Sequence, residues 1–341
     1  LKLGSSRPFW VHLAQQLVLL EAMGACNEGM RKLLMPAEGS CTRDWEGFGE
    51  LEDGSMLMIS HVGMSAYSTD ASRKLFLEGL GSADRDPLQI GRTQLRLEKV
   101  AGEADTSTWP GQLYVWVENL KQTWENCRSL HESMEREVVE SAICCHDERF
   151  PDALVLRDPG TANAIVVNQA PKGYAAAMRK ALGGKNDDSN LVCLMDLLFL
   201  VPTGISAQLG GFYQRFLSAR VSKSNDGYRL HFGAGDFLRQ TFTIKDDEAQ
   251  TDAWNDSYFS HEVCFYMDSA AKFRIAFSKF SKAGLVSLDW KAVESTGEFC
   301  FDRCVDVNGS TILQLKHVIR SPAHSECPIK TEAVDPALMG A

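Results

Sequence analysis

The chain has 341 residues, 44% of them hydrophobic, and its 35 basic and 45 acidic residues give a formal net charge of −10 at pH 7. This length and hydrophobic content suffice for two domains with buried cores and exclude a disordered chain. The acidic balance and the lack of a long basic run argue against a nucleic-acid partner or an anionic membrane surface.

Residues 1–55 are expected to form a helical extension followed by a loop. The segment 9–35 is rich in Leu and Met, but His12, Gln16 and Glu21 interrupt it before the ~20 apolar residues that a membrane span requires. We therefore expect an amphipathic helix and no membrane span. The glycines of residues 36–55 predict a loop. Because the chain lacks an initial Met, a lost targeting peptide is compatible with the sequence.

A pattern of apolar strand, turn and amphipathic helix occurs twice along the chain. The first copy is predicted as a strand over Met56–Tyr67 and a helix over Ala71–Leu80, and the second as a strand over Leu194–Val201 and a helix over Gln208–Leu217. Such self-similarity is typical of a fold built from repeated units.

A weaker echo follows each copy. An alternating strand from Gln112 precedes a predicted helix through Trp124, and another from Glu262 precedes a helix through Phe273. The sequence thus predicts four strand-helix-strand units in two consecutive pairs. The expected divisions are a first paired domain over 56–171, a linker over 172–191, a second paired domain over 192–321, and a surface tail over 322–341.

This organisation resembles the vicinal-oxygen-chelate superfamily, which includes glyoxalase I, bleomycin-resistance proteins and type I extradiol dioxygenases. The resemblance covers residues 56 to 321 and rests on the strand-turn-helix segments at His61 to Gly81 and Val201 to Leu217 and on two closing hairpins. One hairpin contains Asp158-Pro159-Gly160, and the other turns at Asp306 to Gly309, which is similar to the family's Asp-Pro-x-Gly hairpin. It implies an α+β fold of four βαβββ modules, whose curved sheets enclose cups for a small-molecule ligand.

Strand parity sorts side chains between the packed face and the cup, because successive residues of a strand point to opposite faces. Val62 and Met64 form an apolar set, so His61 should face the cup, and by the same test Glu262 faces inward while His261 and His317 are packed. The expected cup-lining residues are His61, Gln112, Tyr114, Trp116, Tyr266 and Lys316.

The resemblance also implies metal positions on the first and last strands of the modules. In this chain they fall at or near Asp196, Glu262 and Gln314, where the dioxygenases have two histidines and a glutamate. An all-oxygen set suits Mg²⁺, Mn²⁺ or Ca²⁺ better than Zn²⁺, and it lacks the two-His-one-carboxylate set of ferrous sites. The expected cofactor is a divalent metal (Mg, Mn or Fe), and the alternative is a polar cluster satisfied by Lys316, Arg229 or water.

Two hypotheses for the function follow. The chain is either a glyoxalase- or dioxygenase-like protein, with a metal as Lewis acid if it is a lyase, isomerase or dioxygenase, or a non-catalytic relative with a protein partner or a homo-oligomeric role. The ten cysteines lack a Cys-x-x-Cys pair and predict free, buried thiols. A reducing intracellular compartment, the cytoplasm or an organelle lumen, is therefore expected.

Overall fold

The computed structural model describes residues 56–100, 109–133, 153–181, 189–224, 226–233, 240–250 and 261–328. The predicted N-terminal extension over 1–55 and the predicted tail beyond residue 328 lie outside the described residues. All described residues belong to one compact unit.

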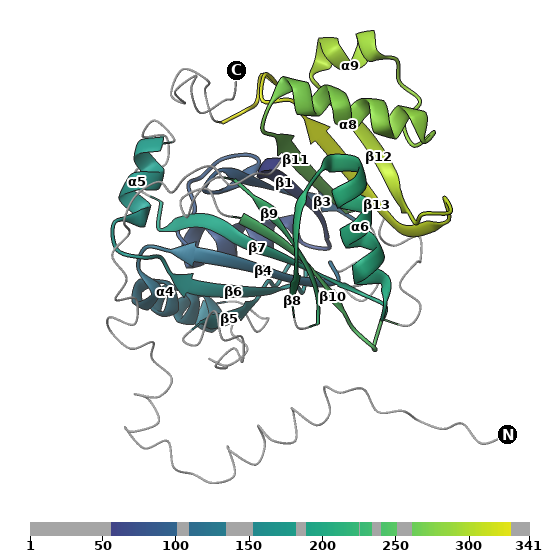
Figure 1. Cartoon of the computed structure of the whole chain (residues 1–341). Coiled ribbons are helices and arrows are strands. Elements are labelled where there is room, and N and C mark those ends of the chain that lie inside the picture. The colour runs from purple at the N-terminus through teal and green to yellow at the C-terminus, as the bar shows by residue number, and fades with distance from the viewer. Residues whose placement is uncertain are drawn as a thin grey trace, which may run out of the picture. The chain divides into compact units, whose positions relative to one another are not determined.

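The described strands form two mixed β-sheets (Figure 1). The six-stranded sheet has the order β12-β13-β11-β1-β3-β2 and contains β1 (Met56–Ala66), β2 (Leu88–Ile90), β3 (Thr93–Lys99), β11 (Glu262–Met267), β12 (Glu298–Val305) and β13 (Thr311–Arg320). The seven-stranded sheet has the order β5-β6-β4-β7-β10-β9-β8 and contains β4 (Gly111–Val117), β5 (Leu154–Arg157), β6 (Ala164–Gln169), β7 (Leu191–Val201), β8 (Arg220–Ser224), β9 (Gly227–Phe232) and β10 (Gln240–Asp246).

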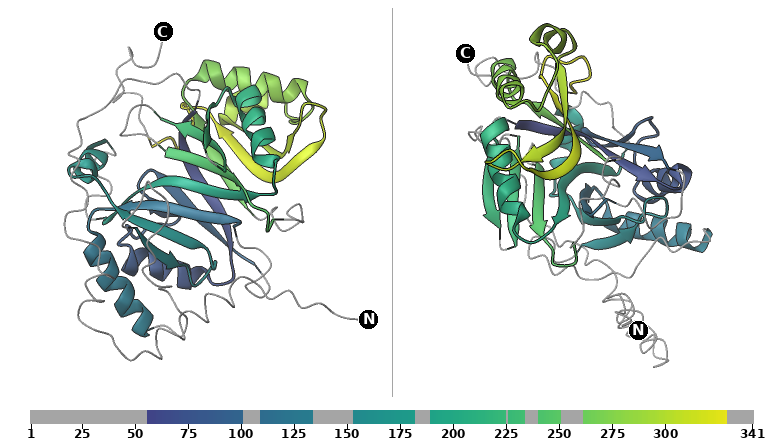
Figure 2. Two further views of the ribbon diagram at one scale, coloured as in Figure 1. Left: turned by 60° about the horizontal axis from the view of Figure 1, so that its bottom comes forward. Right: turned by 90° about the vertical axis from the view of Figure 1, so that its right-hand side faces the viewer.

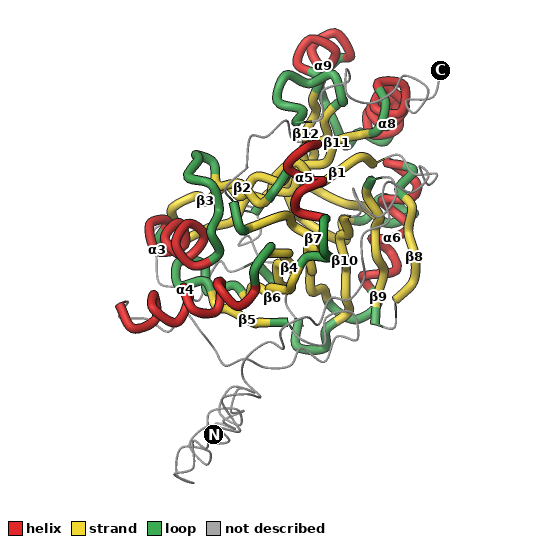
Figure 3. Tube along the Cα trace, turned by 90° about the vertical axis from the view of Figure 1, so that its left-hand side faces the viewer, coloured by secondary structure: helices red, strands yellow, loops and turns green. Residues whose placement is uncertain are grey.

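The described helices include one after the first strand of each unit and two at other places in the chain. They are α3 (Thr69–Lys74), which continues as a π-helix over Leu75–Gly79, α4 (Leu120–Ser133), α5 (Tyr174–Ala181), α6 (Ile205–Leu217), α8 (Ala270–Lys282) and α9 (Trp290–Thr296). Ser68 and Ser269 cap α3 and α8 by accepting hydrogen bonds from Ala71 N and Lys272 N. The turn residues after β1 and β11 thus act as the N-caps of these two helices. Figures 2 and 3 show that α3 lies beside α4, and α6 beside α8.

The predicted α+β class and the four repeated units are confirmed by this strand topology. The third unit, β7-α6-β8-β9-β10, is a complete βαβββ module. The first and fourth units have three strands each, and α9 in the fourth occupies the chain position of β8 in the third. The four units are therefore related modules of unequal strand number.

The pairing of the modules differs from the expected pairing of neighbours. The six-stranded sheet joins the first and fourth modules through antiparallel β1 and β11, and the seven-stranded sheet joins the second and third through β4 and β7. Each sheet therefore takes strands from both predicted ranges, 56–171 and 192–321. The cause is edge pairing between first strands, which the sequence pattern of a module leaves open.

The two sheets and their helices share one apolar cluster, which includes Phe76, Phe199, Phe212, Phe265 and Phe280. A buried amide adds a polar link between the sheets. Gln240 on β10 accepts from Ile59 N at 2.9 Å and donates to Thr93 Oγ1 at 2.9 Å and to Leu194 O at 3.1 Å. Because buried polar groups are costly unless bonded, these contacts fix the position of the sheets relative to each other.

The expected linker over 172–191 is partly packed structure. Its helix α5 buries Tyr174 and Met178 against Val192 and Cys193, and the Tyr174 ring meets Trp116 edge to face at 4.8 Å. The alanine-rich helix inferred from sequence is present, but apolar burial holds this segment to the seven-stranded sheet.

Two further findings concern the described residues. None of their helices is long and apolar enough to cross a membrane. Six of the cysteines lie among them, all as free thiols, and Cys127, Cys193, Cys264 and Cys304 are buried, as expected from the sequence.

Candidate functional site

A charged cluster lies where the first strands of the two modules in the six-stranded sheet meet. His61 on β1 is fully buried, and its Nε2 lies 2.5 Å from Oε1 of Glu262 on β11. The antiparallel register places Gly63 opposite Glu262, and a Cβ atom at Gly63 would lie 3.0 Å from the Glu262 Cβ. Glycine at this position therefore leaves room for the glutamate.

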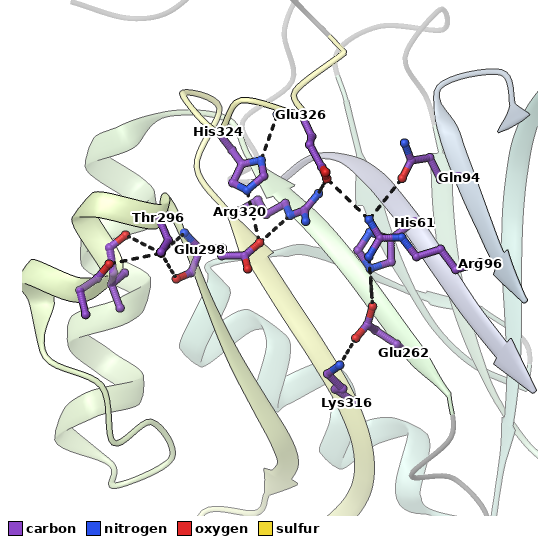
Figure 4. Close-up of polar contacts among 12 residues, drawn as sticks. His61, Gln94, Arg96, Glu262, Thr296, Glu298, Lys316, Arg320, His324 and Glu326 are labelled. Atoms are coloured by element: carbon purple, nitrogen blue, oxygen red, sulfur yellow. Dashed lines mark hydrogen bonds and ion pairs between the residues drawn. The ribbon is translucent and has the colours of Figure 1, made fainter. Parts of the chain in front are cut away.

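The last strands of the same two modules supply two cations. Lys316 on β13 is paired in register with Glu262, and its Nζ contacts Oε2 of that residue. Arg96 on β3 is paired in register with Gly63, and its Nη1 lies 3.9 Å from Glu262 Oε1. Figure 4 shows these side chains converging from four strands. The cluster therefore draws one residue from the first and the last strand of each module.

A pocket of about 260 Å³ opens beside this cluster, lined by Gly63, Arg96, Glu98, His261, Glu262 and Lys316 among others. Its volume is slightly below the ~300–1,000 Å³ of drug-sized ligand pockets. The cup expected from the sequence thus contains a small, charged cavity on the six-stranded sheet.

The charge states of the cluster follow from its contacts. Burial lowers the pKa of His61, and its hydrogen bond with Glu262 offsets only part of that effect. Burial alone would raise the pKa of Glu262, but hydrogen bonds from His61 and Lys316 lower it to about 2. The hydrogen bond to Glu262 raises the pKa of Lys316. At neutral pH the cluster therefore holds a carboxylate, a neutral imidazole that donates from Nε2, and two cations.

These charge states favour binding over proton transfer. A general base works best with a pKa near the operating pH, and Glu262 is a weak base because its pKa is far below 7. His61 is buried away from solvent and donates its Nε2 proton to Glu262. The cluster is suited to holding charged or hydrogen-bonding groups of a ligand in a fixed geometry.

The predicted cup-lining residues are divided between the sheets. His61 and Lys316 both contact Glu262, which lines the pocket together with Lys316, and Tyr266 lies on the same strand as Glu262, with its ring centroid 6.3 Å from that of His324. Gln112, Tyr114 and Trp116 lie on β4 of the seven-stranded sheet, where the Tyr114 hydroxyl donates to Gln112 at 3.0 Å. The predicted set is therefore divided between the two sheets.

The packed face predicted by parity is confirmed on three strands. Val62 and Met64, Val263 and Phe265, and Leu313 and Leu315 all belong to the apolar core. His317 is buried on that side and accepts a hydrogen bond from the Tyr213 hydroxyl at 2.7 Å, while its Nδ1 donates to Leu315 O. His261 is also buried, with its ring 5.6 Å from that of Trp109.

The predicted metal trio is not one site, because its residues lie in different sheets. Asp196 is on β7 of the seven-stranded sheet, where the Thr243 hydroxyl contacts both of its carboxylate oxygens at 2.9 and 2.8 Å. Glu262 and Gln314 are on β11 and β13 of the six-stranded sheet, and Gln314 is not among the residues that line the pocket. The trio is separated because the first module pairs with the fourth and the second pairs with the third.

The residues at the pocket do not fit a divalent metal. Two of the four converging positions hold the cations Arg96 and Lys316, and the carboxylate of Glu262 is already compensated by Lys316. A divalent ion there would be repelled by both cations. Within the described residues no three His, Cys, Asp or Glu side chains are grouped as metal ligands.

Two charged groups of the site were not anticipated. Arg96 alternates with Leu95 and Leu97 on β3, so the parity test applied to this strand would have found it. Glu326, in the segment after β13, contacts Arg320 and Arg96. No strand or helix pattern points to Glu326, because the segment is irregular.

A comparison of the backbone with solved structures finds several chains that align with most of this chain. Glyoxalase I from Zea mays is 12% identical, with 77% of this chain and 92% of that chain covered and a TM-score of 0.47. A putative dioxygenase from Bacillus subtilis is 9% identical, with 80% and 88% covered and a TM-score of 0.48. The cppA protein from Streptococcus pneumoniae is 13% identical, with 78% and 98% covered and a TM-score of 0.37.

No protein-family model and no curated protein sequence matches the chain. The strand topology itself defines the class, an α+β protein of four modules that pair through their first strands. The similarity to the solved structures concerns the backbone fold alone.

Proposed function

We propose that the pocket of the six-stranded sheet binds a small organic molecule without a metal ion. The observation that carries this proposal is the convergence of Arg96, Glu262 and Lys316 on one cavity, with the buried His61 fixing the glutamate. Ligand sites combine a concave surface with a few well-placed polar groups, and this pocket has both.

The side chain of Glu262 is held in place by two partners, which supports a binding role. Its two oxygens are held by different partners, His61 at Oε1 and Lys316 at Oε2. A side chain fixed in this way loses little conformational entropy when a ligand binds, so the binding free energy is not spent on ordering it. The neighbouring Lys316 is half-exposed and can reach a ligand.

The test is ligand binding by purified protein treated with a chelator. A fragment library of small polar molecules is screened by NMR, and hits are compared between the native protein and the Glu262→Gln and Asp196→Asn variants. We expect hits whose affinity changes at least tenfold with Glu262→Gln, because Glu262 fixes Lys316 at the pocket, and is unchanged with Asp196→Asn, because Asp196 lies on the other sheet. Binding that requires added Mg²⁺, Mn²⁺ or Fe²⁺, or hits insensitive to Glu262→Gln, would overturn the proposal.

A non-catalytic role with a protein partner or a second copy of the chain is the competing hypothesis. It predicts no small-molecule hits at the pocket, together with a stable complex or oligomer in size-exclusion chromatography. The free thiols of the described cysteines support our inference of a reducing compartment.

A further inference from the structure

A carboxylate of the chain itself lies against the arginine that lines the pocket. Glu326, in the segment that follows β13, places Oε2 at 2.6 Å from Arg320 Nη1 and at 3.6 Å from Arg96 Nη2 (Figure 4). Arg96 thus belongs both to the pocket and to the contact with this C-terminal segment. The structure shows how an oxyanion can be held at this edge of the pocket.

Arg96 keeps unused hydrogen-bonding capacity. Its contacts are Gln94 Oε1 at 3.4 Å, Glu326 at 3.6 Å and Glu262 at 3.9 Å, all longer than the ~2.7–2.9 Å of a charge-assisted hydrogen bond. The side chain is 38% exposed, so a ligand can reach it. An accessible guanidinium with only long contacts is complementary to a planar oxyanion, which it can bind through two parallel hydrogen bonds.

The other charged groups of the pocket also leave hydrogen-bond donors available to a ligand. Glu262 is already bound by His61 and Lys316, so its need for donors is met within the protein. Lys316 gives one contact to Glu262 and is half-exposed, so its remaining N–H donors can turn to a ligand. The pocket therefore offers remaining N–H donors from two cations, beside the two carboxylates of its lining, Glu98 and Glu262, of which Glu262 is already bound.

The segment carrying Glu326 is held by turn hydrogen bonds and by His324, whose Nε2 lies 3.3 Å from Glu298 Oε2 and whose Nδ1 accepts from Glu326 N at 3.1 Å. Turn hydrogen bonds join His324 N to Ser321 O and Cys327 N to His324 O, and the main anchor of Glu326 is its ion pair with Arg320. Glu326 is half-exposed. Its pKa is lowered by Arg320 and Arg96, although partial burial acts in the opposite direction, so it is a carboxylate at neutral pH.

We propose that the pocket binds small carboxylates, whose carboxylate group is held by Arg96 and Lys316, and that Glu326 competes with the ligand for Arg96. The inference rests on the proposed binding function and specifies its ligand class. When a ligand carboxylate occupies Arg96, Glu326 keeps its closer partner, Arg320, so release of Arg96 requires only a small movement of the segment.

The test uses matched pairs of probes that differ in charge alone: acetate with acetamide, propionate with propionamide, and benzoate with benzamide. Each is titrated by NMR into the native protein and into Glu326→Gln, Arg96→Gln and the control Glu294→Gln, which changes an exposed glutamate on α9. Urea unfolding of each variant checks that the fold is retained.

We expect at least one carboxylate to bind tenfold more tightly than its amide. Glu326→Gln should increase that affinity about fivefold because a competing charge is removed, Arg96→Gln should abolish the preference for the carboxylate, and Glu294→Gln should change neither. Equal binding of acids and amides, or no effect of Glu326→Gln, would overturn the carboxylate inference while leaving the binding function intact. If no probe and no fragment binds at the pocket, the proposed function fails as well.

Discussion

Each sheet carries one acidic residue on the first strand of a module, and the surroundings of that residue differ between the two sheets. In the six-stranded sheet Glu262 is 15% exposed, meets two cations and a histidine, and borders a pocket. In the seven-stranded sheet Asp196 is 1% exposed, and the Thr243 hydroxyl contacts both of its oxygens. The same topology thus supports an open charged site in one sheet and a buried polar contact in the other, so the surrounding side chains decide the role of an acid.

The largest expected effect concerns the residue that joins the two sheets. Gln240→Leu should destabilise the protein by about 2–4 kcal/mol, because Ile59 N and Leu194 O lose a buried hydrogen-bond partner. The measurement is the free energy of unfolding in urea. Gln208→Leu, at an exposed position on α6, is the control and should stay within about 0.5 kcal/mol of the native protein.

Hydrogen exchange can show whether the substitution affects one sheet or both. If Gln240 links the sheets, the variant should lose protection in both β1 and β7, which lie in different sheets. Loss of protection in the seven-stranded sheet alone would show that the amide supports only its own sheet.

The next effect concerns acid stability. Burial lowers the pKa of His317 to about 3, and burial also lowers the pKa of His61. A histidine that is neutral in the folded protein stabilises it fully above the unfolded pKa near 6.5, and this stability is lost as the pH falls towards 3. His317 alone should therefore lower the unfolding free energy by about 2 kcal/mol between pH 6.5 and pH 5.

The His317→Gln variant isolates this contribution. Unfolding in urea at a series of pH values should give a shallower decline between pH 6.5 and pH 5 than in the native protein. Tyr213→Phe removes the hydrogen bond to the ring but keeps the histidine, so it should lower stability and retain the steep decline. Equal slopes for His317→Gln and the native protein would contradict the assignment.

A smaller effect is expected at the pocket. Lys316→Met removes the cation bound to Glu262, which is largely buried, and should cost about 1 kcal/mol at pH 7. The lowered pKa of Glu262 contributes stability above the unfolded value near 4.5 that is lost as the pH falls towards 2. In the variant the folded-state pKa of Glu262 lies closer to its unfolded value, so this loss should be smaller and should end at a higher pH, which urea unfolding between pH 3 and pH 6 can measure.

The smallest effect is expected for a similar lysine of the other sheet. Lys245 on β10 contacts Asp226 at 2.9 Å, but both side chains are well exposed. Lys245→Met should therefore change the unfolding free energy by less than about 0.5 kcal/mol. A loss as large as that of Lys316→Met would show that the ion pairs of the two sheets do not differ in the way their burial indicates.

The sequence predicted the modules and the orientation of single strands better than it predicted the site. Parity assigned His61 and Glu262 to one face, where the two side chains contact each other, because the neighbouring Val62, Met64, Val263 and Phe265 form the core face. It could not tell which modules share a sheet, because the four first strands resemble one another and edge pairing depends on the whole chain. The trio of Asp196, Glu262 and Gln314 was inferred from neighbour pairing and was separated by the actual sheets.

The contact between His61 and Glu262 spans 201 residues of sequence, and this has a consequence for biosynthesis. At roughly 5–20 residues per second, a ribosome delivers Glu262 about 10–40 s after His61. The seven-stranded sheet consists of strands from residues 111 to 246 and can be completed in that interval. During this time β1 cannot pair with β11, because β11 has not yet been synthesised. A waiting apolar strand edge is the kind of surface that chaperones shield and that pairs wrongly when unshielded. The candidate binding site can therefore be completed only after β11 and β13 have been synthesised.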